Sequence, residues 1–289
     1  MLPLSATAST AFCISSKWST FHPGVDDVNS SLTHTNNGGC SILFINGFLS
    51  LFLFMEVVKR EFKSLDGLSV PSFHVKAKTD KAVVIIHGYS SSKDEWLGFS
   101  YNVAEKGVDA IAIDLRGHGD NENPLDENVL NDVEGVIKEL RNEFEKVYTI
   151  GHSLGGLLSL CSSSDLAFAI SPPLTSKLLP EPKFMLRLNS CKVREKHPEV
   201  LFNILERLNP PRRKDNALIF YGSGESKGIK MAVKEWSKGR NVNVVEIKEN
   251  QATLPEIGVD IEKLRDYLPN FISHLSIATA KEIVEKIRF

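Results

Sequence analysis

The sequence predicts an α/β domain built on a mostly parallel sheet that is flanked by helices and has a short helical cap. From residue 55 onward, short apolar stretches typical of buried strands alternate with longer stretches of helical periodicity. Such alternation is typical of parallel strands joined by helices. The chain has 289 residues, of which 42% are hydrophobic, and this is sufficient for one large domain with a full core.

The first predicted element of this domain is a hairpin. Two strand-like runs at residues 57–62 and 68–75 flank the turn dipeptide Asp66-Gly67. Continuous apolar runs then suit parallel strands that are buried on both faces. Strands are expected at residues 82–86, 109–115, 146–150, 166–170, 217–221 and 242–247, and helices between them at 94–105, 129–144, 153–160 and 227–237.

Residues 172–215 interrupt this alternation with a helical segment that is rich in Lys and Arg. An insertion after the strand at 166–170 would overhang the carboxyl ends of the strands, where open α/β sheets bind ligands. We interpret the segment as a cap over the site. The alternative is a solvated helical hairpin with no role in substrate binding.

Residues 1–54 differ in composition from the rest of the chain, being rich in Ser, Thr and Asn and poor in acidic residues. Their apolar run at 41–54 is shorter than the roughly 20 residues that cross a bilayer, and it lacks the flanks of a signal peptide. We expect this leader to be disordered or not part of the native protein, with Met55 as the true start and residues 55–289 as the domain. A membrane anchor is the alternative.

Composition narrows the classes of partner. A formal net charge of −2 argues against a nucleic-acid surface, which normally shows a basic excess. The four scattered cysteines form no CxxC pair, so we expect no metal knuckle, no dense disulfide framework and a reducing cytoplasmic setting. The expected partner is a small molecule, without nucleic acid or membrane association, and the sequence leaves the oligomeric state open.

One motif predicts a nucleophile. Gly151-His152-Ser153-Leu154-Gly155 matches G-x-S-x-G and lies between the strand at 146–150 and a helical run. Small residues around the serine permit a sharp turn from strand to helix that exposes its hydroxyl group. Ser153 is therefore the predicted nucleophile.

Two further segments follow predicted strands, namely His87-Gly88-Tyr89 and Asp114-Leu115-Arg116-Gly117-His118-Gly119. With the serine motif, they resemble the α/β-hydrolase superfamily, in particular its monoacylglycerol-lipase-like and serine-aminopeptidase-like branch. The resemblance extends from residue 55 to the C-terminus, with the cap the least comparable part. It implies an oxyanion hole formed by the backbone N–H groups of Leu154 and Tyr89. It also implies that the three motif histidines shape loops and are not catalytic bases.

The same resemblance implies an acid in the loop after the strand at 217–221. This chain has Gly222-Ser223-Gly224-Glu225 there, so Glu225 takes the position of the usual aspartate. A surface glutamate that caps the following helix is the alternative.

The base is where the sequence departs from the family pattern, because residues 248–255 contain no histidine. His274 is the single histidine further downstream. In one interpretation it belongs to a displaced catalytic loop. In the other it lies on the flank of an amphipathic helix, since apolar residues from Ile261 to Leu275 recur at helical spacing. His197 in the cap is a weaker candidate, because a mobile cap would position a base poorly.

These residues predict a serine hydrolase that cleaves an ester-like bond of a small acyl ester through an acyl-enzyme. The expected catalytic residues are Ser153, Glu225 and His274, with Tyr89 and Leu154 as oxyanion donors and no metal or organic cofactor. The alternative is a non-catalytic protein of the same fold that binds a ligand or protein, because the usual histidine loop is missing. We do not expect an epoxide hydrolase or dehalogenase, since those members of the fold have Asp in place of Ser153.

Overall fold

The computed structural model describes residues 40–45, 48–53, 55–175, 180–213, 215–248, 274 and 281–289. The chain divides into two units, Met1–Phe54 and Met55–Phe289, each with its own sheet. In the first unit, strands β1 (Cys40–Ile45) and β2 (Phe48–Leu53) pair antiparallel. Most of the leader lies outside the described residues, and the expectations about it therefore stay predictions.

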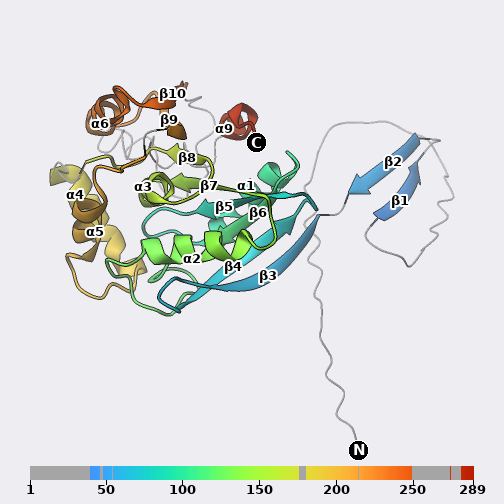
Figure 1. The fold of residues 1–289 in the computed structure, drawn as a ribbon, viewed down its shortest axis with the longest axis horizontal. Helices are drawn as coiled ribbons and strands as arrows, with labels where there is room; N and C mark the ends of the chain where they lie inside the picture. Colours follow the sequence, from blue (N-terminus) through green and yellow to red (C-terminus); the bar gives the residue numbers. More distant parts are fainter. Residues whose placement is uncertain are drawn as a thin grey trace, which may run out of the picture. The chain divides into compact units, whose positions relative to one another are not determined.

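The second unit contains an eight-stranded sheet with the strand order β10-β9-β8-β7-β5-β6-β4-β3 (Figure 1). Its strands are β3 (Glu56–Lys63), β4 (Ser69–Lys76), β5 (Lys81–Ile86), β6 (Asp109–Ile113), β7 (Lys146–His152), β8 (Ala167–Ile170), β9 (Asp215–Gly222) and β10 (Asn241–Ile247). The pairs from β6 to β10 are parallel, whereas β4 runs antiparallel to β3 and β6. The predicted mostly parallel sheet is confirmed.

The hairpin of β3 and β4 forms where the sequence predicts it. Gly67 has φ +82°, a left-handed conformation that glycine adopts without steric cost. The Ser64 hydroxyl donates to Asp66 Oδ1 at 2.6 Å, a side-chain hydrogen bond that stabilises the turn. The hairpin therefore extends the sheet on the far side of β6 with two antiparallel strands.

Helices connect the parallel strands, as the alternation predicts. They are α1 (Leu97–Ala104), α2 (Leu130–Leu140), α3 (Leu154–Cys161) and α6 (Lys227–Ser237), and a further helix, α9 (Lys281–Lys286), lies near the C-terminus. The helix expected from residue 94 begins instead with a 3₁₀ turn, η1 (Lys93–Trp96), whose first N–H, that of Lys93, donates to Asp114 Oδ1. Within the described residues, no helix has the length and apolar character to span a membrane.

Two apolar clusters cover the two faces of the sheet. One contains Leu157 of α3, Val133 of α2 and Val233 of α6, and the other contains Val103 of α1 and Ile283 of α9. All five side chains are fully buried, which places the cores directly against the sheet. Burial of this kind supplies the main favourable free energy of folding.

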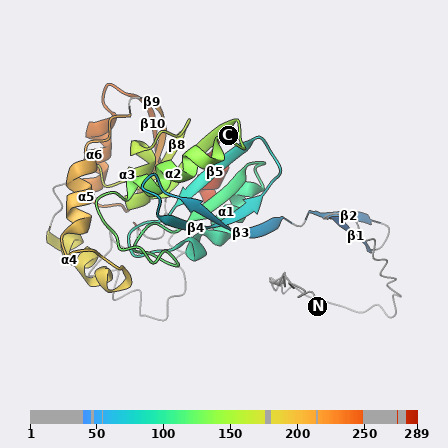
Figure 2. The ribbon, with the colours of Figure 1, turned by 60° about the horizontal axis from the view of Figure 1, so that its bottom comes forward.

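The predicted cap segment contains α4 (Pro180–Asn189), the 3₁₀ turn η2 (Ser190–Lys192) and α5 (Val200–Leu208). Figures 1 and 2 show α4 and α5 side by side. Arg187 of α4 pairs with Glu199 and lies 4.8 Å from the Phe202 ring of α5. After η2 in the chain, Glu195 forms a parallel β-bridge with Leu125. The predicted cap segment is thus attached to the loop that follows β6, and its role as a cap stays a prediction.

Candidate active site

The candidate site lies at the carboxyl ends of the parallel strands. The His87-Gly88 turn follows β5, Ser153 follows β7, and Glu225 follows β9. Strands β5 and β7 are neighbours, while β6 lies on the other side of β5, so the chain order reverses beside β5. Open α/β sheets bind ligands at the carboxyl edge near such a reversal.

Ser153 occupies a strained turn between β7 and α3. Its backbone has φ 52° and ψ −116°, a conformation that is uncommon for any residue with a side chain. The turn needs glycine on both sides, because a Cβ at Gly151 would lie 2.0 Å from the Gly155 oxygen and one at Gly155 would lie 2.2 Å from the Ile86 oxygen. This is the sharp strand-to-helix turn that G-x-S-x-G permits.

Glu225 follows β9 by three residues and is only 3% exposed. Its carboxylate accepts a hydrogen bond of 2.7 Å from the Ser226 N–H. Burial raises the pKa of the Glu225 carboxyl, but the facing His274 imidazole, together with the Ser171 hydroxyl and the Ser226 N–H, outweighs burial and lowers that pKa below its ordinary value of 4.5. Glu225 is therefore ionised at neutral pH and is not the surface capping residue of the alternative interpretation.

His274 is the partner of this carboxylate. His274 Nδ1 lies 2.8 Å from Glu225 Oε2, and the His274 side chain is 14% exposed. Because an ionised carboxylate only accepts hydrogen bonds, Nδ1 carries a proton, and in the neutral form of the ring the lone pair is therefore on Nε2. The amphipathic spacing that suggested another place for His274 falls mostly outside the described residues.

His152 connects Ser153 to the segment that contains His274. His152 Nε2 lies 2.8 Å from the His274 backbone oxygen, and the two rings are 4.8 Å apart with an interplanar angle of 44°. Ser153 follows His152 directly, so the nucleophile candidate is the chain neighbour of the residue that contacts the base candidate. Among the described residues, no hydrogen bond joins the Ser153 hydroxyl to His274, and such bonds often form only when substrate is bound.

Tyr89 and Leu154, the predicted oxyanion donors, belong to segments on either side of Ser153. A Cβ built on Gly88 would lie 3.4 Å from Ser153 Cβ, so the turn before Tyr89 contacts the serine directly. Leu154 is the first residue of α3, and the first N–H groups of a helix lack intrahelical acceptors. The Tyr89 hydroxyl donates to Glu195 of the cap at 2.6 Å, a contact that sequence reasoning missed.

The remaining motif histidines are buried and neutral. Burial lowers the pKa of His87 to about 4 and that of His118 to about 3. His87 Nδ1 lies 2.7 Å from the Gly88 oxygen, and its Nε2 accepts from the Leu115 N–H. His118 Nδ1 lies 3.0 Å from the Arg116 oxygen. Both rings connect loops at the carboxyl edge of the sheet.

His197 is not brought to this cluster, because its Nε2 lies 2.9 Å from Glu127 Oε1. The structure also shows no metal centre within its described residues, since no group of three or more His, Cys, Asp or Glu side chains there is arranged to hold an ion. Of the two histidines weighed as bases, His274 alone faces a buried carboxylate.

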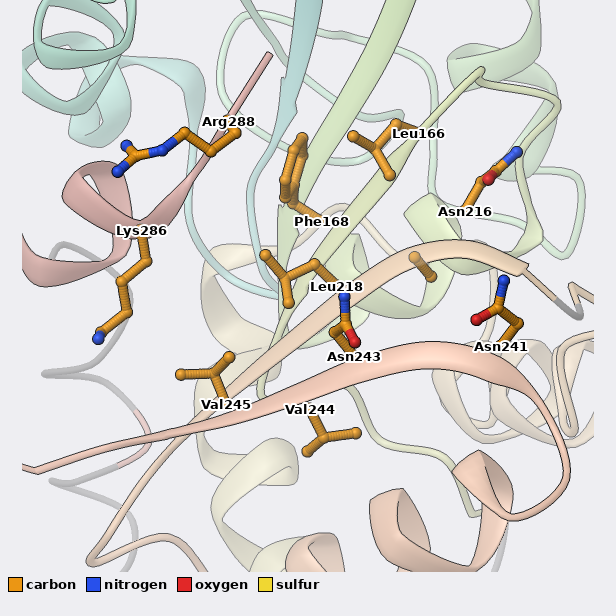
Figure 3. Close-up of a pocket in the computed structure, with 11 residues that line it drawn as sticks. Leu166, Phe168, Asn216, Leu218, Asn241, Asn243, Val244, Val245, Lys286 and Arg288 are labelled. Atoms are coloured by element: carbon orange, nitrogen blue, oxygen red, sulfur yellow. The ribbon is translucent and has the colours of Figure 1, made fainter.

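A separate pocket lies on the sheet away from Ser153 (Figure 3). Its wall includes Asn216 and Asn241 at the amino ends of β9 and β10, together with Phe168, Lys286 and Arg288. Ligand sites of open α/β sheets form at the opposite edge. This pocket contains none of the predicted site residues.

Comparison with known proteins agrees with this architecture. Residues 81–166 match the family described as the alpha/beta hydrolase fold. The chain is also similar to epoxide hydrolase 3 of Siraitia grosvenorii, with 30% identity over 87 residues, which are 28% of this chain and 27% of that protein. The match thus spans about a quarter of the relative's length.

Solved structures resemble most of the chain. The Pyrococcus furiosus esterase Pf2001 superposes with a TM-score of 0.51 and 18% identity, over 75% of this chain and 92% of that one. The Exiguobacterium antarcticum esterase EaEST superposes with a TM-score of 0.51 and 17% identity, over 74% and 99% of the two chains. At such identities the likeness concerns the fold, and the lipase-like branch stays a prediction. The chain has the α/β-hydrolase fold.

Proposed function

We propose that this protein is a serine hydrolase that cleaves a carboxylic ester of a small acyl group through an acyl-enzyme. The observation that supports this function best is the 2.8 Å contact between Glu225 and His274, beside a serine in the strained turn after β7. A serine nucleophile requires a histidine base, and a buried, ionised carboxylate orients that base.

In the proposed first step, His274 Nε2 removes the Ser153 hydroxyl proton while Oγ attacks the carbonyl carbon of the ester. The N–H groups of Leu154 and Tyr89 donate to the oxyanion of the tetrahedral intermediate. The His274 imidazolium, stabilised by Glu225, then protonates the departing alkoxide and leaves an acyl-Ser153 ester. Water hydrolyses this ester by the same sequence and regenerates Ser153.

The ester specificity rests on two arguments. The two structural neighbours named above are esterases. Opening of an epoxide by a covalent route uses a carboxylate nucleophile, and this chain has the Ser153 hydroxyl at the corresponding turn, so we favour acyl transfer over epoxide opening despite the short match to an epoxide hydrolase.

Labelling with a fluorophosphonate tests this function, because the probe reacts with an activated serine. We expect intact mass analysis to show one adduct on the wild type and on His197→Ala, and no adduct on Ser153→Ala. His274→Ala should label at least about a hundredfold more slowly, since losing the base costs several powers of ten in rate. Ser159→Ala, a buried serine of α3, is the matched control for the nucleophile variant and should label normally.

Hydrolysis of a short p-nitrophenyl ester by the same proteins provides the second readout. If the folded wild type neither reacts with the probe nor hydrolyses the ester, the serine hydrolase proposal is wrong. The protein would then be a binding protein that retains the fold without its chemistry. If His197→Ala loses labelling and His274→Ala retains it, the base assignment is wrong.

A further inference from the structure

His152 is a buried titratable residue to which the proposed reaction assigns no step. Its ring contacts three separate segments of the candidate site. It lies 4.8 Å from the His274 ring and 6.1 Å from the Trp96 ring of η1, measured between centroids. A Cβ at Gly88 would lie 3.1 Å from His152 Nδ1. The ring therefore lies between the His87-Gly88 turn, η1 and His274.

The hydrogen bond of His152 determines its tautomer. The acceptor is the backbone oxygen of His274, 2.8 Å from His152 Nε2. A carbonyl oxygen has no proton to donate, so Nε2 carries the proton and donates it. Burial, followed by the charge of His274, lowers the pKa of His152 to about 3, and Nδ1 is therefore unprotonated at neutral pH.

We propose that His152 is a positioning residue that holds the backbone of His274, so that the His274 ring keeps its contact with Glu225 and presents Nε2 to Ser153. The inference rests on the proposed function for its catalytic consequence. Its structural basis is independent of that function, because the His152 side chain contacts the backbone of His274, which lies 122 positions later in the chain.

Neutrality is part of this role. In each half of the proposed cycle His274 accepts a proton and becomes positively charged, and its ring lies 4.8 Å from His152. A second positive charge at that distance would oppose the protonation of His274. A side chain at position 152 must therefore donate a hydrogen bond without carrying charge, and neutral imidazole meets both requirements.

The test compares His152→Gln with His152→Leu. Glutamine is neutral and its amide can reach the same carbonyl oxygen as a donor, whereas leucine fills similar space without a donor. We expect His152→Gln to retain kcat within about threefold, and His152→Leu to lose about tenfold to a hundredfold in kcat with KM nearly unchanged, because small displacements of catalytic groups cost this much. The rate of fluorophosphonate labelling should fall in parallel.

A matched control is His74→Leu, which removes a buried histidine donor at the other end of the strands. His74 Nε2 lies 2.7 Å from Asp109 Oδ2, where β6 begins. We expect His74→Leu to lower thermal stability while leaving kcat per folded molecule unchanged. This comparison separates a general loss of stability from a loss of positioning.

The second readout does not depend on activity. The Nδ1 proton shared by His274 and Glu225 should give a far-downfield proton NMR resonance that disappears in His274→Ala. We expect it in the wild type and in His152→Gln, and we expect it broadened or absent in His152→Leu.

The inference is wrong if His152→Leu matches His152→Gln in kcat and labelling, or if its defect lies in KM alone. If the wild type proves inactive, the proposed function fails, and the resonance alone decides the inference. A resonance retained in His152→Leu, or missing from folded wild type, would then overturn it.

Discussion

Glu225, His274 and His152 show how environment assigns different protonation states to neighbouring side chains. The Glu225 carboxyl is buried yet ionised, because the His274 imidazole faces it at 2.8 Å. His152 is buried and donates to the backbone oxygen of His274, and burial keeps its ring neutral. The chemistry of the cluster therefore depends on which side chain faces which, and single substitutions at these positions should have specific effects.

Replacing Glu225 with Gln tests the ionised carboxylate at this scale. Glutamine keeps the size of the side chain but removes the charge that stabilises protonated His274. We expect kcat/KM for a p-nitrophenyl ester to fall by about 10² to 10⁴ with little change in KM. Glu235→Gln on the exposed side of α6 is the control and should behave like the wild type. Unchanged activity in Glu225→Gln would mean that another group orients His274.

At the scale of elements, the packing of α3 against β5 positions the candidate nucleophile. The backbone of Gly155 approaches the Ile86 oxygen so closely that a Cβ there would lie 2.2 Å from it. Real Cβ atoms do not come this near to backbone atoms, so α3 would have to move away from the sheet. The turn that contains Ser153 would move with it, since Leu154 begins the helix.

Substitutions of two helical glycines should therefore have opposite effects on stability. Gly155→Ala should lower the free energy of unfolding by about 3 kcal/mol through overpacking. A Cβ at Gly98 of α1 would meet nothing within 4 Å, so Gly98→Ala should raise that free energy by about 0.5–1 kcal/mol. Urea unfolding of both variants measures the difference. Similar stability in Gly155→Ala and wild type would argue against the close contact of α3 with β5.

At the scale of the whole molecule, buried ion pairs connect segments that are distant in sequence. The Arg116 guanidinium is fully buried and pairs with Asp66 of the hairpin turn, Asp126 of the following loop and Asp132 of α2. Lys93 of η1 likewise pairs with Asp114, the residue after β6, with 2.7 Å between Lys93 Nζ and Asp114 Oδ2. Loss of the Arg116 or the Lys93 side chain would leave the buried carboxylate of Asp132 or Asp114 without its cationic partner, and this is strongly destabilising.

The buried histidines make global stability dependent on pH. The pKa values of His87, His118 and His152 lie at about 4, 3 and 3 in the folded protein, below their ordinary value of 6.5. Between the ordinary pKa and the lowered pKa, these histidines are protonated in the unfolded chain but not in the folded protein. Their contribution to stability is therefore largest above pH 6.5 and falls as the pH decreases. We expect a loss of up to about 1.4 kcal/mol per pH unit for each histidine.

Urea unfolding at pH 7, 6 and 5 measures this dependence. His118→Gln should reduce its slope, because one of the three groups no longer titrates. A free energy of unfolding that stays constant from pH 7 to pH 5 would contradict the buried, neutral state of these histidines.

The sequence by itself determined the sheet, its hairpin and the turn at Ser153. These features depend on local patterns, because apolar runs predict buried strands and Gly151 and Gly155 permit a sharp turn wherever the chain lies. The 3₁₀ turn η1 was missed, since the same helical spacing is compatible with a 3₁₀ turn and with the first turn of an α-helix.

Only the tertiary structure decided which histidine faces Glu225. His274 and Glu225 are 49 positions apart, and no periodicity relates them. The sequence therefore left both a helix flank and a displaced loop open for His274. The contact of His152 with the His274 backbone was likewise invisible, because a hydrogen bond to a carbonyl oxygen places no requirement on the side chain of the accepting residue.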